Sequence, residues 1–295
     1  MELSVSVGVC AYNEENTIGR VLDATIAQES ELAKVSEILV ISSGSTDKTD
    51  EIVKRYAKTD SRIKLVRQEK KEGKASAVNL FLAKAKADVL ILLSADVIPQ
   101  KKTFDALAEP FASESVGMTT GRPVPDNNPD TFMGFVVHLI WRLHNQLQAV
   151  SPKANEILAM RPVVGKIDKK SAVDDLQLEI LVKEKGYQVV YRDDAVVINH
   201  GPETIGDLIK QRRRIITGYL HARDAKDYTP ITMDKLRVLS TLLNNLEFSP
   251  KKLVWTLAAV ALEVYTRVWA NVDYYVLKKN PYNWEISEST KKVGA

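Results

Sequence analysis

The chain has 295 residues, which is enough for one large domain or two small ones. Hydrophobic residues make up 45% and charged residues 27% of the sequence, as in an ordinary globular protein. A formal net charge of +3 is too small to indicate a nucleic-acid partner, so we expect none. Cys10 is the single cysteine, which excludes an internal disulfide and fits a reducing, cytoplasmic location. The N-terminal sequence MELSVSVGVC predicts a strand and has no signal-peptide pattern.

Strand and helix patterns alternate over the first 120 residues. Strands are expected at Ser4–Ala11, Glu37–Ile41, Ile63–Arg67 and Val89–Leu93. Helices are expected at Asn16–Ser30, Thr46–Lys58 and Gly73–Ala85. This order predicts an α/β fold whose central sheet is mostly parallel and flanked by helices on both faces.

The pattern is looser after Gly121. The Pro-, Asn- and Asp-rich segment Arg122–Asp130 predicts a loop. Further elements are a helix from Thr131 to about Gln148, a short apolar strand within SPKANEILAMRP, a helix at Asp174–Lys185 with Gly186 as its C-cap, short strands at Gln188–Tyr191 and Ala195–Asn199, and a long basic helix from Thr204 to about Ala225. We expect residues 1–227 to form one α/β domain and residues 228–295 to form a helical extension.

The extension contains two helical patterns, Met233–Leu246 and Leu253–Leu277. On the second, one arc is polar, and it comprises Thr256, Glu263, Thr266, Arg267, Asn271 and Asp273. The opposite face either packs on the core or lies on a membrane surface, with lysine pairs at both ends of the helix. The longest uncharged apolar stretch, Leu253–Leu262, is shorter than the roughly 20 residues that a spanning helix needs.

Polar segments follow the ends of several expected strands. They are AYNEEN (Ala11–Asn16), SSGSTDKT (Ser42–Thr49) and SAD (Ser94–Asp96), and EGKASAVN (Glu72–Asn79) opens a helix. Because the carboxyl ends of parallel strands meet at one edge of a sheet, these segments predict a nucleotide-sized crevice there. Gly44 and Gly73 permit tight turns or a close approach to a ligand. Asn13 and Asp47 are expected to shape the turns, and Cys10 to pack in the core.

Taken in order, these segments resemble the family 2 glycosyltransferases, which are inverting enzymes with the GT-A fold. The resemblance covers about Val5 to Gly218. It starts at AYNEE and continues through SGSTDKT and GKASAVN. Asp174-Asp175-Leu176 stands where the family has Glu-Asp-Leu, and QRRRI (Gln211–Ile215) matches its Gln-x-x-Arg-Trp motif except for Ile215. Five ordered motifs are together a specific signal.

The resemblance implies transfer of a sugar from a nucleotide-diphosphate sugar, most simply a UDP-sugar, to a hydroxyl of a glycan or lipid-linked acceptor. It implies that Asp175 is the catalytic base. Without the resemblance, the preferred interpretation of Asp174 and Asp175 is that they are acidic residues favoured in the first turn of a helix. The implied donor-binding residues are Ala11, Tyr12, Glu14, Ser43, Lys74, Ala95, Asp96, Gln211 and Arg214. The Gln-x-x-Arg-Trp motif is typical of family members that work at membranes, so we expect association with the inner face of a membrane. The replacement of its Trp by Ile215 argues against processive synthesis.

The resemblance also implies a divalent cation, Mg²⁺ or Mn²⁺, held by Asp96. The family carries Asp-x-Asp here, but this chain has Ser94 at the first position, which leaves metal independence open. Asp96 alone also fits a turn or a helix N-cap. His200, in NHGPET, is a second candidate ligand, or a strand-end histidine bonded to backbone.

Two other functions stay open. Ser94 is compatible with a non-catalytic module that binds a sugar nucleotide. A sugar nucleotidyltransferase would also use a nucleotide-binding α/β sheet, but it would carry a Gly-rich loop with Arg and Lys after the first strand, and AYNEEN is not such a loop.

Overall fold

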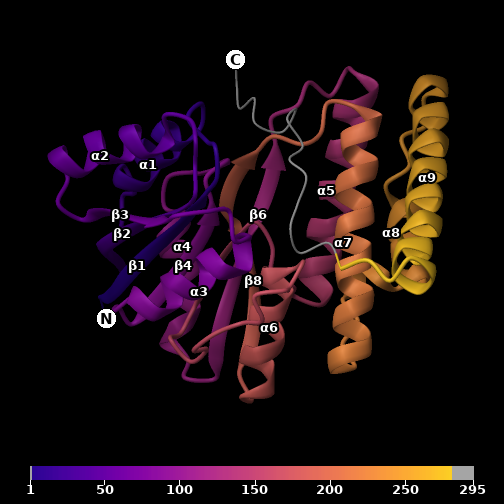
Figure 1. Ribbon diagram of the computed structural model, residues 1–295. Helices are drawn as coiled ribbons and strands as arrows, with labels where there is room; N and C mark the ends of the chain where they lie inside the picture. The colour runs from indigo at the N-terminus through magenta and orange to yellow at the C-terminus, as the bar shows by residue number, and fades with distance from the viewer. Residues whose placement is uncertain (1, 281–295) are drawn as a thin grey trace.

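The centre of the protein is a sheet of eight strands, seen in a computed structural model that describes residues 2–280 (Figure 1). The strands are β1 (Leu3–Ala11), β2 (Ala33–Ser43), β3 (Ile63–Gln68), β4 (Val89–Ser94), β5 (Val97–Pro99), β6 (Val116–Pro125), β7 (Ile157–Met160) and β8 (Gln188–Asn199). Their order in the sheet is β3-β2-β1-β4-β7-β6-β8-β5.

Most neighbouring strands are parallel, as expected. β3, β2, β1 and β4 are parallel to one another, and so are β6 and β8. β7 runs antiparallel between β4 and β6, and β5 pairs antiparallel with β8. The buried Val, Ile and Leu residues of β1 and β4 suit strands that are covered on both faces. The carboxyl ends of β1, β2 and β4 consequently meet at one edge.

Helices cover both faces of this sheet (Figure 1). On one face lie α1 (Ile18–Ile26), α2 (Thr49–Thr59) and α4 (Thr103–Ala108), and on the other lie α3 (Lys74–Lys84) and α6 (Asp174–Glu184). In α1 the buried residues are Ile18, Val21, Leu22 and Thr25, which is the spacing of one helix face. Gly8 of β1 lets the Phe81 ring of α3 approach so closely that a Cβ there would lie 2.6 Å from it.

A second group of helices stands beside the sheet (Figure 1). It comprises α5 (Phe132–Val150), α7 (Ile205–Lys226), α8 (Lys235–Asn244) and α9 (Pro250–Asn271), which continues into a π-helical turn at Val272–Val276. Short 3₁₀ turns occur at Glu109–Ala112 and Ile231–Met233. The Phe135 ring of α5 lies 5.6 Å from that of Trp255 of α9, so α9 is anchored at its N-terminal end.

Three parts of the sheet differ from the sequence-based expectation. The short strand β5 was not predicted. β8 is one continuous strand where two short strands were expected. β6 was not predicted, and it runs to Pro125, into the segment expected to be a loop. β7 pairs only with Met118–Thr120 of β6, so the last residues of β6 have a single neighbour, β8. Prolines are tolerated at such a half-paired strand end.

The apolar face of α9 packs on the core only in part. Its fully buried residues are Thr256, Thr266 and Ala270. Trp255 and Leu262 are partly buried against α5, whereas many of its other large apolar side chains point outward. Leu257 is 71% exposed and Val264 and Val268 are each 56% exposed. Of the two alternatives for the apolar face, core packing therefore holds only for the part of α9 that contacts α5, and most of the face is exposed. The helical run Pro250–Val276 has 27 residues, and by length and composition alone it is long and apolar enough to cross a membrane. The uncharged stretch Leu253–Leu262, considered by itself, was too short for this.

The polar arc of α9 is held against α7 by ion pairs. The carboxylate of Glu263 accepts hydrogen bonds from Arg212 at 2.7 and 3.0 Å and from Arg267 at 2.7 Å. Ten residues further on, the Asp273 carboxylate accepts hydrogen bonds from Arg213 at 2.6 and 2.9 Å. The basic character of the long helix α7 is thus largely used in binding the extension.

Candidate active site

A cavity of about 1410 Å³ opens where the carboxyl ends of β1, β2 and β4 meet α6 and α7. It continues between α5, α7, α8 and α9, where many apolar side chains line it together with the ion-paired Arg212, Glu263 and Arg267. All of the site residues predicted from the sequence line it: Ala11, Tyr12, Glu14, Ser43, Lys74, Ala95, Asp96, Asp175, His200, Gln211 and Arg214. The structure therefore brings together segments that lie up to about two hundred residues apart in the chain.

The loops after β1 and β2 are tied to each other. Asn13, which has a φ of 53°, accepts a hydrogen bond from the Thr46 amide through its Oδ1 at 2.8 Å. Asp47 accepts from the Glu15 amide at 3.0 Å and from the Thr49 amide, so both residues shape the loops as expected. Gly44 has a φ of 69°, and a Cβ there would lie 2.6 Å from the backbone of Lys70. These contacts hold the predicted donor-binding loops in place.

Two loop residues face the cavity in a way that suits a planar or charged ligand group. The Lys71 ammonium lies 4.6 Å from the centre of the Tyr12 ring. Ser43 Oγ accepts a hydrogen bond from the Glu72 amide at 3.3 Å, which joins the second loop to the segment that opens α3. Aromatic, hydroxyl and ammonium groups are thereby gathered on one wall.

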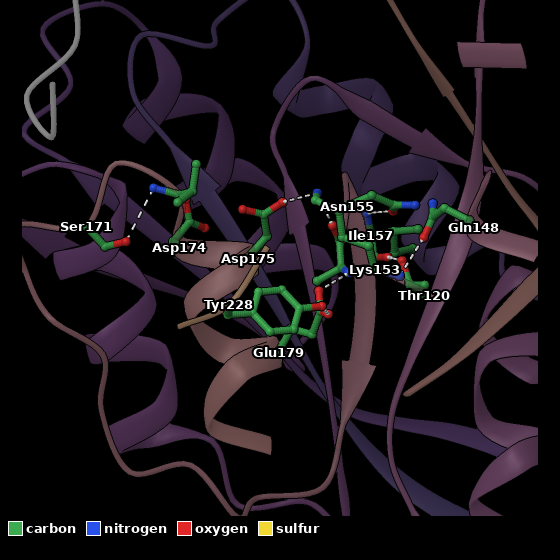
Figure 2. A network of polar contacts seen from close by, with 12 residues as sticks. Thr120, Gln148, Lys153, Asn155, Ile157, Ser171, Asp174, Asp175, Glu179 and Tyr228 are labelled. Carbon is green, nitrogen blue, oxygen red and sulfur yellow. Dashed lines mark hydrogen bonds and ion pairs between the residues drawn. The ribbon is translucent and has the colours of Figure 1, made fainter. Parts of the chain in front are cut away.

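Two aspartates start α6 and face two lysines. Lys74 Nζ lies 3.4 Å from Asp174 Oδ2, and Lys153 Nζ lies 3.7 Å from Asp175 Oδ2. Figure 2 shows Asp175 and Lys153 pointing toward each other. Asp174 is buried, whereas Asp175 is 27% exposed and reaches the cavity. Asp175 is thus the carboxylate of the pair that a substrate hydroxyl can approach.

Lys153 is a buried cation, at 3% exposure, that the sequence analysis did not identify. Its Nζ donates to the carbonyl of Ala154 at 2.8 Å and lies over the Tyr219 ring at 5.2 Å. The adjacent Ala154 amide donates to the fully buried Glu179 carboxylate at 2.8 Å (Figure 2). Burial acts to lower the pKa of Lys153, but Tyr219 and Asp175 raise it overall, so the ammonium stays charged.

Gln211 and Arg214 lie three residues apart on α7 and both line the cavity, as the motif implies. Burial lowers the pKa of Arg214, and the nearby carboxylates, led by Asp174, act in the opposite direction. A guanidinium group in this position presents its donors to anionic oxygens in a parallel fork. The pair therefore suits binding of a diphosphate.

A carboxylate that the sequence analysis missed, Glu156, also lines the cavity. Burial and, after it, the negative charge of Asp96 raise the pKa of Glu156 to about 7. Its only sequence signal was a glutamate directly before an apolar strand, in ANEIL. Within residues 2–280 no cluster of three or more His, Cys, Asp or Glu side chains has metal-binding geometry, so this cavity offers carboxylates singly or in pairs.

Both ring nitrogens of His200 are engaged. Nδ1 lies 2.6 Å from Asp126 Oδ1, and Nε2 lies 3.2 Å from Glu203 Oε1. The partners are side chains rather than the backbone groups that were considered. For His200 to bind a cation, Glu203 would have to release Nε2.

Cys10 stands at the end of β1, next to Ser94 in the parallel pairing of β1 with β4. Burial raises the pKa of its thiol to about 12, with smaller effects from Lys74 and Asp174. The thiol is therefore protonated at neutral pH, in agreement with the expected packing role.

Comparison with known families gives two overlapping matches. The family described as Glycosyl transferase family 2 matches residues 6–161, and Glycosyl transferase family group 2 matches residues 95–277. Together they cover the sheet, the cavity and the helices of the extension up to the end of the π-helical turn.

Curated relatives are synthases of a bacterial polysaccharide. The chain is 24% identical over 288 residues to poly-β-1,6-N-acetyl-D-glucosamine synthase of Staphylococcus epidermidis, covering 93% of this chain and 68% of the relative. It is 27% identical over 223 residues to the synthase of that name in Staphylococcus aureus strain MSSA476, covering 71% of this chain. The match spans only about half, 53%, of the length of that relative.

Solved structures share the fold. A mannosyltransferase from Pyrobaculum calidifontis in complex with GDP-mannose and Mn²⁺ superposes with a TM-score of 0.61, at 21% identity, over 96% of this chain and 82% of that one. Glucosyl-3-phosphoglycerate synthase from Mycobacterium tuberculosis, in complex with Mn²⁺, UDP and phosphoglyceric acid, gives a TM-score of 0.51 at 20% identity over 74% of this chain and 78% of that one. The GT-A architecture expected from the sequence is confirmed.

Proposed function

Because the chain belongs to the family 2 glycosyl transferases, we propose that it transfers one sugar from a nucleotide-diphosphate sugar to a hydroxyl, with inversion of the anomeric carbon. The observation that carries this proposal is the position of Asp175. Its carboxylate is paired with a buried ammonium and reaches the same cavity as the loops after β1, β2 and β4. The family match and that shared cavity both support a transferase.

Asp175 is the base in this proposal. Its carboxylate accepts the proton of the acceptor hydroxyl while the hydroxyl oxygen bonds to the anomeric carbon and the bond to the diphosphate breaks. Lys153 holds the carboxylate in position by its charge, 3.7 Å away. Arg214 and Lys74 provide positive charge for the departing nucleoside diphosphate. Asp174, buried and paired with Lys74, orients that lysine.

The donor set of the cavity fits a divalent cation. Asp96 is a carboxylate at the end of β4, and oxygen ligands suit Mg²⁺ and Mn²⁺. The solved relatives with GDP-mannose or UDP contain Mn²⁺. When bound, such an ion stabilises the negative charge of the leaving diphosphate as a Lewis acid. We propose Asp96 as its first ligand, with His200 available only if Glu203 moves.

For the substrates we propose a UDP-sugar as donor and a glycan or lipid-linked hydroxyl as acceptor. UDP is present in the mycobacterial structure, and the staphylococcal relatives are named for a polymer of N-acetylglucosamine. The part of the cavity between α5, α7, α8 and α9 is lined mostly by apolar residues, which suits an acceptor with an apolar portion. GDP-mannose, as in the Pyrobaculum complex, is the donor to compare.

We further propose that α8 and α9 lie on the inner surface of a membrane. The outward residues of α9, among them Leu257 and Val264, are exposed although they are apolar. Leu239 and Leu243 of α8 are also more than half exposed. Lys251 lies over the Trp255 ring at 4.3 Å, an arrangement that suits the boundary between lipid headgroups and acyl chains. A lipid surface would cover both helices together.

The test is release of nucleoside diphosphate from a panel of UDP-, GDP- and dTDP-sugars, with Mn²⁺, with Mg²⁺ and with chelator. Lipid and glycan acceptors are added in parallel. We expect release from one donor, dependent on the metal and increased by an acceptor. Donor binding measured by calorimetry without release under any condition would contradict a transferase and support the non-catalytic sugar-nucleotide-binding module that Ser94 leaves open.

A further inference from the structure

Glu156 directly precedes β7, the strand that pairs with β4, and continuing their register by one residue sets it opposite Ser94. In the antiparallel pairing of β4 with β7, Leu92 pairs with Leu158 and Leu93 with Ile157. The next pair in this register is Ser94 with Glu156. Residues that face each other across antiparallel strands have Cβ atoms about 5 Å apart and point to the same face of the sheet. A carboxylate on Glu156 therefore reaches the space that a longer, acidic side chain at position 94 would occupy.

Asp96 reaches the same space. It follows the end of β4 by two residues, and it lines the cavity together with Ser94 and Glu156. Of all charged groups, Asp96 acts most strongly on the Glu156 carboxyl group. The two carboxylates are thus neighbours on one rim of the cavity.

These two carboxylates differ from Asp174 and Asp175, which line the same cavity. Asp174 and Asp175 each have a lysine within 3.7 Å. Asp96 and Glu156 have no hydrogen-bond or ion-pair partner among residues 2–280. Two neighbouring carboxylates repel each other. The charges of Lys74 and Arg214 oppose this effect at Glu156, and a divalent cation between the two carboxylates would remove the repulsion directly. This arrangement fits Mg²⁺ or Mn²⁺, which proteins bind through one or two carboxylates while substrate phosphates complete the coordination.

We propose that Glu156 is the second carboxylate ligand of the cation in this chain, working with Asp96 in place of the acidic residue that Ser94 lacks. The inference rests on the proposed function, because the diphosphate of the donor supplies the remaining ligands. It moves one ligand of the site from the end of β4 to the residue directly before the neighbouring strand β7. The longer side chain of glutamate spans the additional distance between the strands.

The test measures binding of Mn²⁺ by electron paramagnetic resonance of the free ion, in the presence of UDP. Glu156→Gln keeps the shape of the side chain and removes its charge, and Glu69→Gln, at an exposed loop residue, is the matched control. We expect Glu156→Gln to weaken Mn²⁺ binding by at least about tenfold, which is the effect typical of a lost supporting group at a metal site. Calorimetric binding of UDP in chelator is expected to stay within about twofold of wild type, because no cation takes part.

A double variant makes the test independent of a general loss of structure. Ser94→Asp returns a carboxylate to β4, so Ser94→Asp combined with Glu156→Gln is expected to recover most of the Mn²⁺ affinity. Wild-type Mn²⁺ affinity in Glu156→Gln would overturn this inference alone, provided that wild type binds Mn²⁺ with UDP. Loss of affinity that Ser94→Asp fails to restore would also overturn it. A wild-type protein that binds neither UDP nor Mn²⁺ would overturn the proposed function as well.

Discussion

The contact between Glu263 of α9 and the two arginines Arg212 and Arg267 is expected to stabilise the extension strongly. Although burial acts to raise it, these arginines lower the pKa of Glu263 to about 2. The difference from an ordinary glutamate, with a pKa of about 4.3, corresponds to about 3 kcal/mol at neutral pH. Removal of one partner from a buried ion pair costs about 3–5 kcal/mol, so the two magnitudes agree.

Glu263→Gln is therefore expected to lower the free energy of releasing α9 by about 3 kcal/mol at pH 7. Because the pKa is lowered in the folded protein, this stabilisation is fully present above about pH 4.3 and disappears as the pH falls toward 2. Wild type and variant should then converge in acid. The measurement is hydrogen exchange of the α9 amides together with denaturant unfolding at pH 7 and pH 2. Glu114→Gln, in an exposed turn, is the control.

The reasoning is refuted if Glu263→Gln exchanges its α9 amides like wild type and changes stability by less than about 0.5 kcal/mol, the range of ordinary surface substitutions. A difference between wild type and variant that persists undiminished at pH 2 would also refute the electrostatic cause.

Three further outcomes follow from other parts of the molecule. Lys153→Met removes the buried charge 3.7 Å from Asp175. We expect kcat to fall by about 10–100-fold with the KM for the donor nearly unchanged. The control, Asp130→Asn on the surface, is expected to change neither kcat nor KM. Leu257→Lys places a charge on the exposed apolar face of α9, where Leu257 is 71% exposed. We expect this variant not to float with liposomes. Unchanged flotation at low salt would exclude α9 as the contact surface. Burial raises the pKa of the Cys10 thiol to about 12. We therefore expect native Cys10 to react with iodoacetamide at pH 8 at least about a hundredfold more slowly than Cys10 in the unfolded chain. Equal rates would contradict its burial.

The parallel half of the fold could be predicted because each of its elements carries a local pattern. The apolar run Val89–Leu93 is buried in β4, and the polar segment that follows it faces the cavity. The motif residues, from Tyr12 to Arg214, accordingly line one cavity. β6 was missed because its sequence mixes glycine, threonine and proline, and its pairing with β8 depends on residues about seventy positions away.

The orientation of α9 shows a different limit of sequence reasoning. The polar arc was identified correctly, but an amphipathic pattern states only that the two faces differ. Which face is buried depends on the partner, and here Arg212 and Arg213 of α7 bind the polar arc. Arginines in a long helix carry no local signal that they pair with a segment about fifty residues further along the chain.

Two site residues, Lys153 and Glu156, likewise needed the structure. Each is a single charged residue in an irregular segment before β7, without a spacing that marks it. Lys153 becomes significant through its distance from Asp175, and Glu156 through the register of β7 with β4. Strand register is set by pairing between distant segments, so a linear motif search does not reveal it.

The central claim is that Asp175 removes the proton from the acceptor hydroxyl. Asp175→Asn keeps the size of the side chain but removes its basic oxygen, so the most direct measurement compares sugar transfer with donor binding in this variant. We expect transfer to fall by at least about a thousandfold while the Kd for the donor, measured by calorimetry, stays within about threefold of wild type. Transfer at the wild-type rate in Asp175→Asn would contradict the account.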